Sequence, residues 1–167
     1  MPICTLFQGF DRSRSRGRES GLSSSRMQTD GKRLILKNAA ASTIHRMDRT
    51  FMLIGVVAAF IGVGFGAFGA HSLRGRTSPE MLAVFETGVR YQMYHAFAIL
   101  ITALALSRLD APLIRWAGWL FTAGIVIFSG SLYALVLTGT SSLGAITPFG
   151  GIAFLAGWAC LAIAALL

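Results

Sequence analysis

The twenty residues from Phe51 to Ala70 contain no charged side chain, and this run limits the folds open to the chain more than any other feature. About 20 apolar residues, at a rise of 1.5 Å per residue, form a helix that crosses a hydrocarbon layer about 30 Å thick. Composition agrees, because 54% of the residues are hydrophobic, 13% are charged and the mean hydropathy is +0.63. These values are typical of an integral membrane protein and exclude an ordinary soluble domain.

Three further apolar segments follow this first one. We therefore expect an all-α fold, an integral membrane four-helix bundle over residues 47–167, preceded by a disordered basic tail over residues 1–46. The expected spans are about 51–70, 91–108, 113–137 and 148–167.

The tail carries nine of the 15 Lys and Arg residues and is rich in Ser, Arg and Gly, which is typical of disorder. Three interpretations remain: a cytoplasmic extension, a targeting peptide, or untranslated sequence with Met47 as the natural start. We favour the third, because the spans need nothing from the tail. Basic tails beside a span set topology or contact anionic headgroups, so we expect the lipid bilayer as a partner and no nucleic acid.

Alternation of the spans assigns each connecting segment to a side of the membrane. The tail, the turn 107–112 and the C-terminus share one side, and the segments 71–90 and 138–147 share the other. With the tail counted, the first side is strongly positive and should be cytoplasmic. If translation starts at Met47, the arginines are balanced between the two sides and the orientation stays open.

The second helical pattern, from Thr77 to Leu106, is longer than a span. Its start has a hydroxyl residue before Pro79 and an acid after it, and Thr147-Pro148 repeats the cap-plus-Pro pattern. Thirty residues make a helix of about 45 Å. We therefore expect the first half at the interface, with a bend at Gly88.

Small residues recur along the apolar runs in a pattern that indicates close helix packing. Gly62-x-x-x-Gly66 is typical of helices that approach closely in lipid, and we assign the same role to three other glycines. Such glycine faces also leave open a homo-oligomer as a partner arrangement. The glycines predicted to pack helices are Gly62, Gly66, Gly69, Gly150 and Gly151.

Polar residues gather toward one face of the membrane. Glu86 and Arg90 are four residues apart with the acid first, the favourable order for an intrahelical ion pair. We favour a belt of anchoring and packing residues, and the alternative is a ligand, proton or ion path, for which the deep His95 weighs most. The candidate cluster is His71, Glu86, Arg90, Tyr91, Tyr94, His95, Ser129, Ser131, Tyr133 and Thr147.

No cofactor, metal or catalytic residue is predicted. His71 and His95 lie toward the same face, but a metal site needs more ligands and only Glu86 offers itself; a haem has no further signature. Cys4 and Cys160 share no motif that indicates a disulfide. The chain has no nucleophile elbow, His-Glu-x-x-His or paired carboxylates, so an enzyme is not predicted.

Four segments carry a family resemblance: 66–71, 85–95, 128–133 and 144–151. Together they resemble the YgdD-like family of small four-helix membrane proteins, catalogued as domain of unknown function 423. The resemblance covers about Met47 to Leu167 and implies a bacterial inner-membrane protein, with no substrate, cofactor or catalytic residue to carry over. Members of the family usually begin close to the first span, which supports Met47 as the start.

Two hypotheses about function follow. The favoured one is a small membrane protein with a structural, packing or accessory role. The alternative is a transporter, channel or small-ligand binder whose polar cluster lines a pocket between helices. Four spans are few for a secondary transporter, the chain shows no clear internal repeat or broken helix, and a channel would need several chains.

Overall fold

The structure is a computed structural model that describes Arg33, residues 48–109 and residues 111–167. The chain divides into two units, Met1–Thr43 and Ile44–Leu167, and the helical bundle belongs to the second. Except for Arg33, the tail predicted over 1–46 lies outside the described residues.

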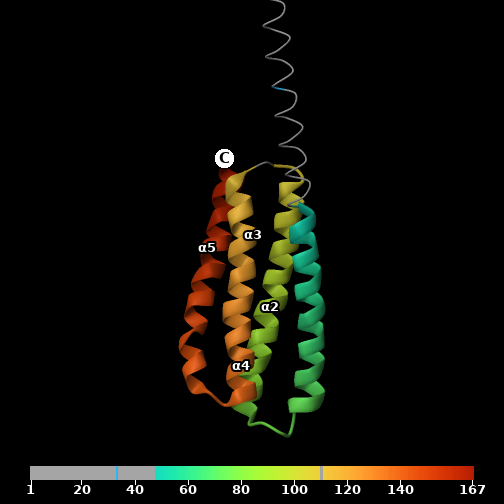
Figure 1. The fold of residues 1–167 in the computed structure, drawn as a ribbon, viewed down its shortest axis with the longest axis vertical. Coiled ribbons are helices and arrows are strands. Elements are labelled where there is room, and N and C mark those ends of the chain that lie inside the picture. The colour runs from blue at the N-terminus through green and yellow to red at the C-terminus, as the bar shows by residue number, and fades with distance from the viewer. Residues whose placement is uncertain (1–32, 34–47, 110) are drawn as a thin grey trace, which may run out of the picture. The chain divides into compact units, whose positions relative to one another are not determined.

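Four helices in the described part of the chain are long and apolar enough to cross a membrane, which confirms the predicted all-α, four-helix fold. In Figure 1 they run side by side, with the C-terminus at the upper end. The first span is Asp48–Leu73 and ends in a π-helical turn, η1 (Gly69–Leu73), and the second is α2 (Pro79–Leu106). The third consists of α3 (Pro112–Gly124), η2 (Ile125–Ser129) and α4 (Gly130–Thr138), and the fourth of η3 (Ser141–Ala145) and α5 (Thr147–Leu166).

Helix boundaries follow local chemistry. Ser78 caps α2 as predicted, because its Oγ accepts a hydrogen bond from the backbone N–H of Met81 at 3.3 Å, and Pro79 is the first helical residue. α4 ends at Gly139, whose φ of 71° lies in the left-handed region that glycine adopts without strain. The helix is not interrupted at Gly88, where a bend was expected, since α2 is continuous from Pro79 to Leu106.

Aromatic rings rest on glycines of neighbouring helices. A Cβ added at Gly118 would lie 2.6 Å from the ring of Phe51, and one at Gly157 would lie 2.6 Å from the ring of Phe121. The absence of a side chain therefore makes the space that each ring fills. The same relation joins the rings of Phe154 to Gly124, Tyr133 to Gly88 and Phe85 to Gly69.

Most of the predicted packing glycines lie at such contacts. A Cβ would come within 2.7 Å of Met93 at Gly62 and within 2.5 Å of the backbone of Phe128 at Gly150. Gly69 is also close, at 3.1 Å from Phe85. The spaces at Gly66 and Gly151 are looser, with nearest atoms at 3.5 and 4.0 Å.

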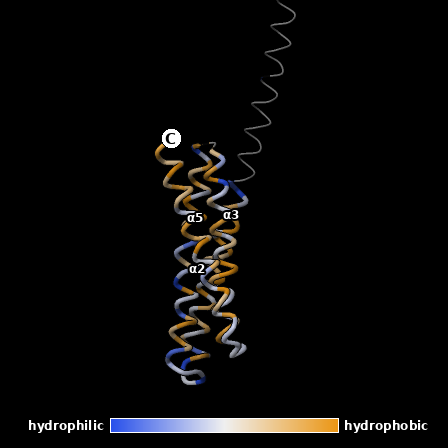
Figure 2. Tube along the Cα trace, turned by 90° about the vertical axis from the view of Figure 1, so that its left-hand side faces the viewer, coloured by the Kyte–Doolittle hydropathy of each residue, from blue (hydrophilic) through white to orange (hydrophobic). Residues whose placement is uncertain are grey.

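The apolar core and the polar contacts occupy different parts of the bundle. The fully buried side chains of the core include Phe51, Ile99, Leu106, Ile114 and Phe121, which lie toward the end where the first span begins. Figure 2 shows hydrophobic residues along most of the helices and hydrophilic ones at both ends of the bundle and partway along α2. Several of the polar candidates lie on that middle part of α2, from Glu86 to His95.

Candidate functional site

A glutamine that the candidate set left out is at the centre of the polar contacts. Gln92 is only 4% exposed, and its Oε1 accepts a hydrogen bond from Tyr133 Oη at 2.9 Å. Its Nε2 donates to the carbonyl oxygen of Ala58 at 2.8 Å. One side chain on α2 thus bonds to both the first and the third span. The signal for it was present in the sequence, because Gly88 and Ala96, one turn before and one turn after Gln92, mark this face as interior.

The π-helical turn η2 contributes the next contact. Ser129, which is fully buried at the end of η2, donates its hydroxyl to the carbonyl oxygen of Gly88 at 2.8 Å. A π-helical turn leaves some carbonyl groups without the usual i+4 partner and widens the helix locally. Here the widened turn also brings Phe128 onto Gly150 of α5. The turn therefore joins the third span to α2 and to α5.

A pair of hydroxyls links the third and fourth spans. The oxygens of Ser131 and Thr147 are 2.7 Å apart, and Ser131 also donates to the carbonyl oxygen of Phe128 at 2.9 Å. Because the Ser131 proton goes to Phe128, Thr147 is the donor of the shared bond. The expectation that Thr147 caps the last helix is wrong: α5 already includes it, and Ile146 is the capping position, without a side-chain cap.

His95 is 5% exposed and lies between α2 and α5. The indole N–H of Trp158 can only donate, so His95 Nε2 accepts this bond at 3.3 Å. The ring proton is then on Nδ1, which donates to the carbonyl oxygen of Tyr91 at 2.8 Å. The Phe154 ring is stacked on the imidazole, with centroids 3.4 Å apart and planes 6° apart. Both ring nitrogens of a neutral histidine are thus satisfied inside the protein.

The other members of the candidate cluster face outward. His71 is exposed in η1, and Glu86 and Arg90 are exposed on α2. Among the described residues, Glu86 and Arg90 do not form the ion pair expected between them. Tyr94 is 57% exposed, whereas Tyr91, also exposed, stacks on Phe128 at 4.6 Å. The structure thus divides the predicted cluster into a buried network and an exposed set.

We define the buried polar network by its buried residues together with two partners to which they are hydrogen-bonded, the half-buried Thr147 and Trp158, whose side chain is 44% exposed. The buried residues are Gln92, His95, Ser129, Ser131 and Tyr133. Within the part of the chain that the structure describes, no buried side-chain nitrogen or oxygen lacks a hydrogen-bond partner. The described residues likewise contain no group of three His, Cys, Asp or Glu side chains that could hold a metal ion.

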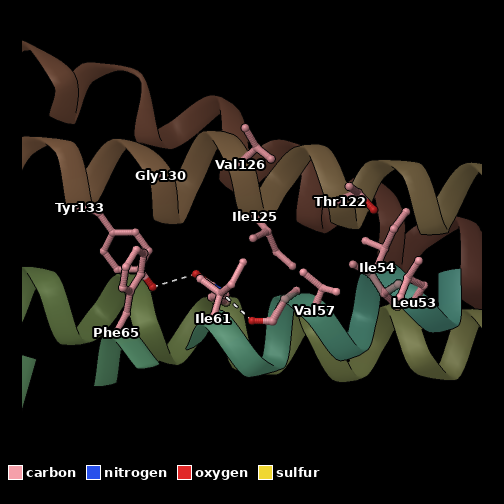
Figure 3. Close-up of a pocket in the computed structure, with 13 residues that line it drawn as sticks. Leu53, Ile54, Val57, Ile61, Phe65, Thr122, Ile125, Val126, Gly130 and Tyr133 are labelled. Carbon is pink, nitrogen blue, oxygen red and sulfur yellow. Dashed lines mark hydrogen bonds between the residues drawn. The ribbon is translucent and has the colours of Figure 1, made fainter. Parts of the chain in front are cut away.

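Two grooves flank this network. The first groove, of about 530 Å³, lies between the first span and the third, and Figure 3 shows apolar side chains of the two spans pointing toward each other. Gln92 and Tyr133 are among its few polar lining residues. The second groove, of about 500 Å³, lies between α2 and α5 and is lined by Tyr91, His95 and Trp158 among others. The first groove thus borders the bonded pair Gln92 and Tyr133, and the second borders the bonded pair His95 and Trp158.

Similarity to known proteins assigns the chain to a family. Residues 65–151 match the sequence model of the family described as "Protein of unknown function (DUF423)". The UPF0382 membrane protein SAB0533 of Staphylococcus aureus is 49% identical over 116 residues, which are 70% of this chain and 94% of the relative. The UPF0382 membrane protein YwdK of Bacillus subtilis is 47% identical over 118 residues, 70% of this chain and 96% of the relative. No solved structure matches.

The relatives are named as membrane proteins, and the four apolar helices agree with a multi-pass membrane protein. The matched segment runs from the end of the first span to the start of α5 and so includes the buried polar network except Trp158. The chain belongs to the DUF423 family of small membrane proteins of unknown function.

Proposed function

We propose that this protein is a structural or accessory protein of the bacterial inner membrane, without enzymatic activity, whose buried polar network holds its helices in register. The observation that carries the proposal is that, among the residues described, the network leaves no buried polar side-chain atom without a hydrogen-bond partner. A site for a polar ligand or an ion needs donors or acceptors that are free to bind it, and this network keeps them engaged.

The geometry of the bonds supports a packing role. Gln92 reaches the backbone of the first span, Ser129 reaches the backbone of α2, and Trp158 of α5 reaches His95. Polar side chains that bond across helices in lipid stabilise association by about 0.6 to 2 kcal/mol each. Bonds to a fixed backbone carbonyl also select one helix register, since a one-residue slip would break them.

The exposed set supports an interfacial role. Tyr94, Arg90 and Glu86 extend from the part of α2 that leads into the bilayer. Tyrosines and charged residues at that level anchor a span at the boundary between hydrocarbon and headgroups. Their roles are therefore to position α2 along the membrane normal.

The alternative, a transporter, channel or small-ligand binder, is favoured by the second groove. His95 and Trp158 line it, and a ligand there would have to take over the hydrogen bond between them. This alternative predicts that the His95–Trp158 bond opens during function, whereas the packing role predicts that it persists.

A thermal unfolding experiment in detergent separates the two. Wild type, His95→Ala and the exposed control Tyr94→Phe would be heated alone and with a panel of metabolites and ions. We expect that no compound raises the Tm of wild type and that only His95→Ala unfolds earlier. A compound that raises the wild-type Tm, and whose effect is lost in a folded His95→Ala variant, would overturn the proposal and favour the ligand site.

A further inference from the structure

The first groove is long, and its shape does not depend on the packing role proposed above. It runs along the first span from Leu53 to Phe65, a distance of about 18 Å at 1.5 Å per residue. One leaflet of the hydrocarbon layer is about 15 Å deep. The groove is thus about as long as one leaflet is deep. It lies between two spans that face lipid.

The lining of the groove accepts hydrocarbon and offers little to a polar ligand. Along the first span it consists of apolar residues such as Leu53, Val57 and Ile61, and Figure 3 shows Ile125 and Val126 on the opposite side. Its polar lining residues are already bonded: Tyr133 to Gln92, Gln92 to Ala58, and Thr122 to the carbonyl oxygen of Gly118 at 2.8 Å.

Aromatic contacts bound the groove lengthwise. Phe51 meets Trp119 edge to face near one end, with centroids 5.3 Å apart, and Phe65 meets Tyr133 near the other, at 4.6 Å. Between these contacts a space of about 530 Å³ remains beside the two spans. In a bilayer, acyl chains are the molecules that surround such a space.

Basic residues border the end of the groove near Phe51. Arg49 precedes Leu53 by one helical turn, and Arg115 precedes Thr122 by two, so each lies on the same side of its helix as a lining residue. Arginine is well suited to bind a phosphate group. Asp48 lies beside Arg49 at this end, and Arg115 already has an interaction within the protein. The two arginines still outnumber this carboxylate among the described residues, so the net positive charge complements the phosphate of a lipid whose chain enters the groove.

We propose that the first groove binds one phospholipid from the leaflet on the Arg49 side, with one acyl chain between the first and third spans and its phosphate near Arg49 and Arg115. The lipid fills the space that the two spans leave and belongs to the folded protein rather than to the exchanging lipid around it.

Two glycines give a matched test. A Cβ at Gly130 meets no atom within 4 Å and would extend into the groove that this residue lines. A Cβ at Gly64 also meets no atom within 4 Å, but Gly64 is exposed on the first span and does not line the groove. Gly130→Phe should therefore fill the groove, and Gly64→Phe adds the same ring outside it.

The full chain would be purified in mild detergent, and phospholipid retained per protein would be measured by native mass spectrometry and by phosphate analysis. We expect one retained phospholipid in wild type and Gly64→Phe, none in Gly130→Phe, and weakened retention in Arg49→Gln. Wild type without retained phospholipid, or Gly130→Phe with as much as wild type, would overturn the proposal. A Gly130→Phe variant that changes the oligomeric state and not the lipid content would instead indicate a second copy of the chain in the groove.

A second measurement does not depend on the variants. Wild type in vesicles would be irradiated with a phospholipid that carries a diazirine in its acyl chain, and the labelled peptides identified. We expect labelling concentrated at 53–61 and 122–130. Labelling spread evenly over all outward-facing helix surfaces would contradict the proposal even if Gly130→Phe failed to fold.

Discussion

Trp158 of α5 donates its indole N–H to Nε2 of His95 on α2 at 3.3 Å, and this bond determines which nitrogen of the imidazole carries the proton. The other nitrogen, Nδ1, then carries the proton and donates a hydrogen bond to the Tyr91 carbonyl oxygen. The residue that the sequence made the strongest candidate for a ligand or proton path is therefore held as a neutral side chain with both nitrogens bonded. Its contacts explain its place in the bundle without a ligand.

Replacing His95 should destabilise the protein. His95→Ala removes the acceptor of Trp158, the stack on Phe154 and a nearly buried ring, and we expect a loss of about 2–3 kcal/mol in the free energy of unfolding. The measurement is reversible unfolding in mixed micelles. Tyr94→Ala, at a position 57% exposed, serves as the control and should cost much less.

Gln92 and Tyr133 should be energetically coupled. Gln92→Leu leaves the Tyr133 hydroxyl without its acceptor, and Tyr133→Phe leaves the amide oxygen without its donor. A double-mutant cycle should show a coupling of about 0.6 kcal/mol, the average for hydrogen bonds between helices in membranes, and at most about 1.7 kcal/mol. Strictly additive effects of the two substitutions would contradict the bond.

Two glycines of the same bundle should respond in opposite ways to the same substitution. At Gly150 an added Cβ would lie 2.5 Å from the backbone nitrogen of Phe128, which cannot rotate away, so Gly150→Ala should force α5 from the third span and destabilise the protein. At Gly130 the space is open, and Gly130→Ala should be neutral or stabilising by up to about 1 kcal/mol. Equal Tm values for the two variants would show that the close approach at Gly150 is not required.

Sequence reasoning predicted the features that depend on local pattern. The four helices follow from runs of apolar residues, and the start of α2 follows from Ser78 and Pro79. The gathering of polar residues toward one membrane face follows from alternation of the spans. His95, Ser129, Ser131 and Tyr133 could be singled out because polar residues inside an apolar run are rare.

The rest depends on tertiary contacts that no local pattern specifies. Gln92 is uncharged and lies beside conspicuous Tyr and His residues, so its central position could be inferred only by following the helix face of Gly88 and Ala96. Thr147 has the local signature of a cap, and its bond to Ser131 comes from the third span, sixteen residues away. The pairing of each aromatic ring with a particular glycine depends on register between helices, and the π-helical turn η2 has no clear signature in its sequence.

The central claim is that the buried polar network stabilises the bundle while the exposed members of the predicted cluster do not. The most direct test is the free energy of unfolding of Gln92→Leu, His95→Ala and Ser129→Ala beside Glu86→Gln and Arg90→Gln, all in one micelle system. We predict that the first three variants each lose about 1–3 kcal/mol and that the last two stay within about 0.5 kcal/mol of wild type. Buried variants as stable as wild type would contradict the claim.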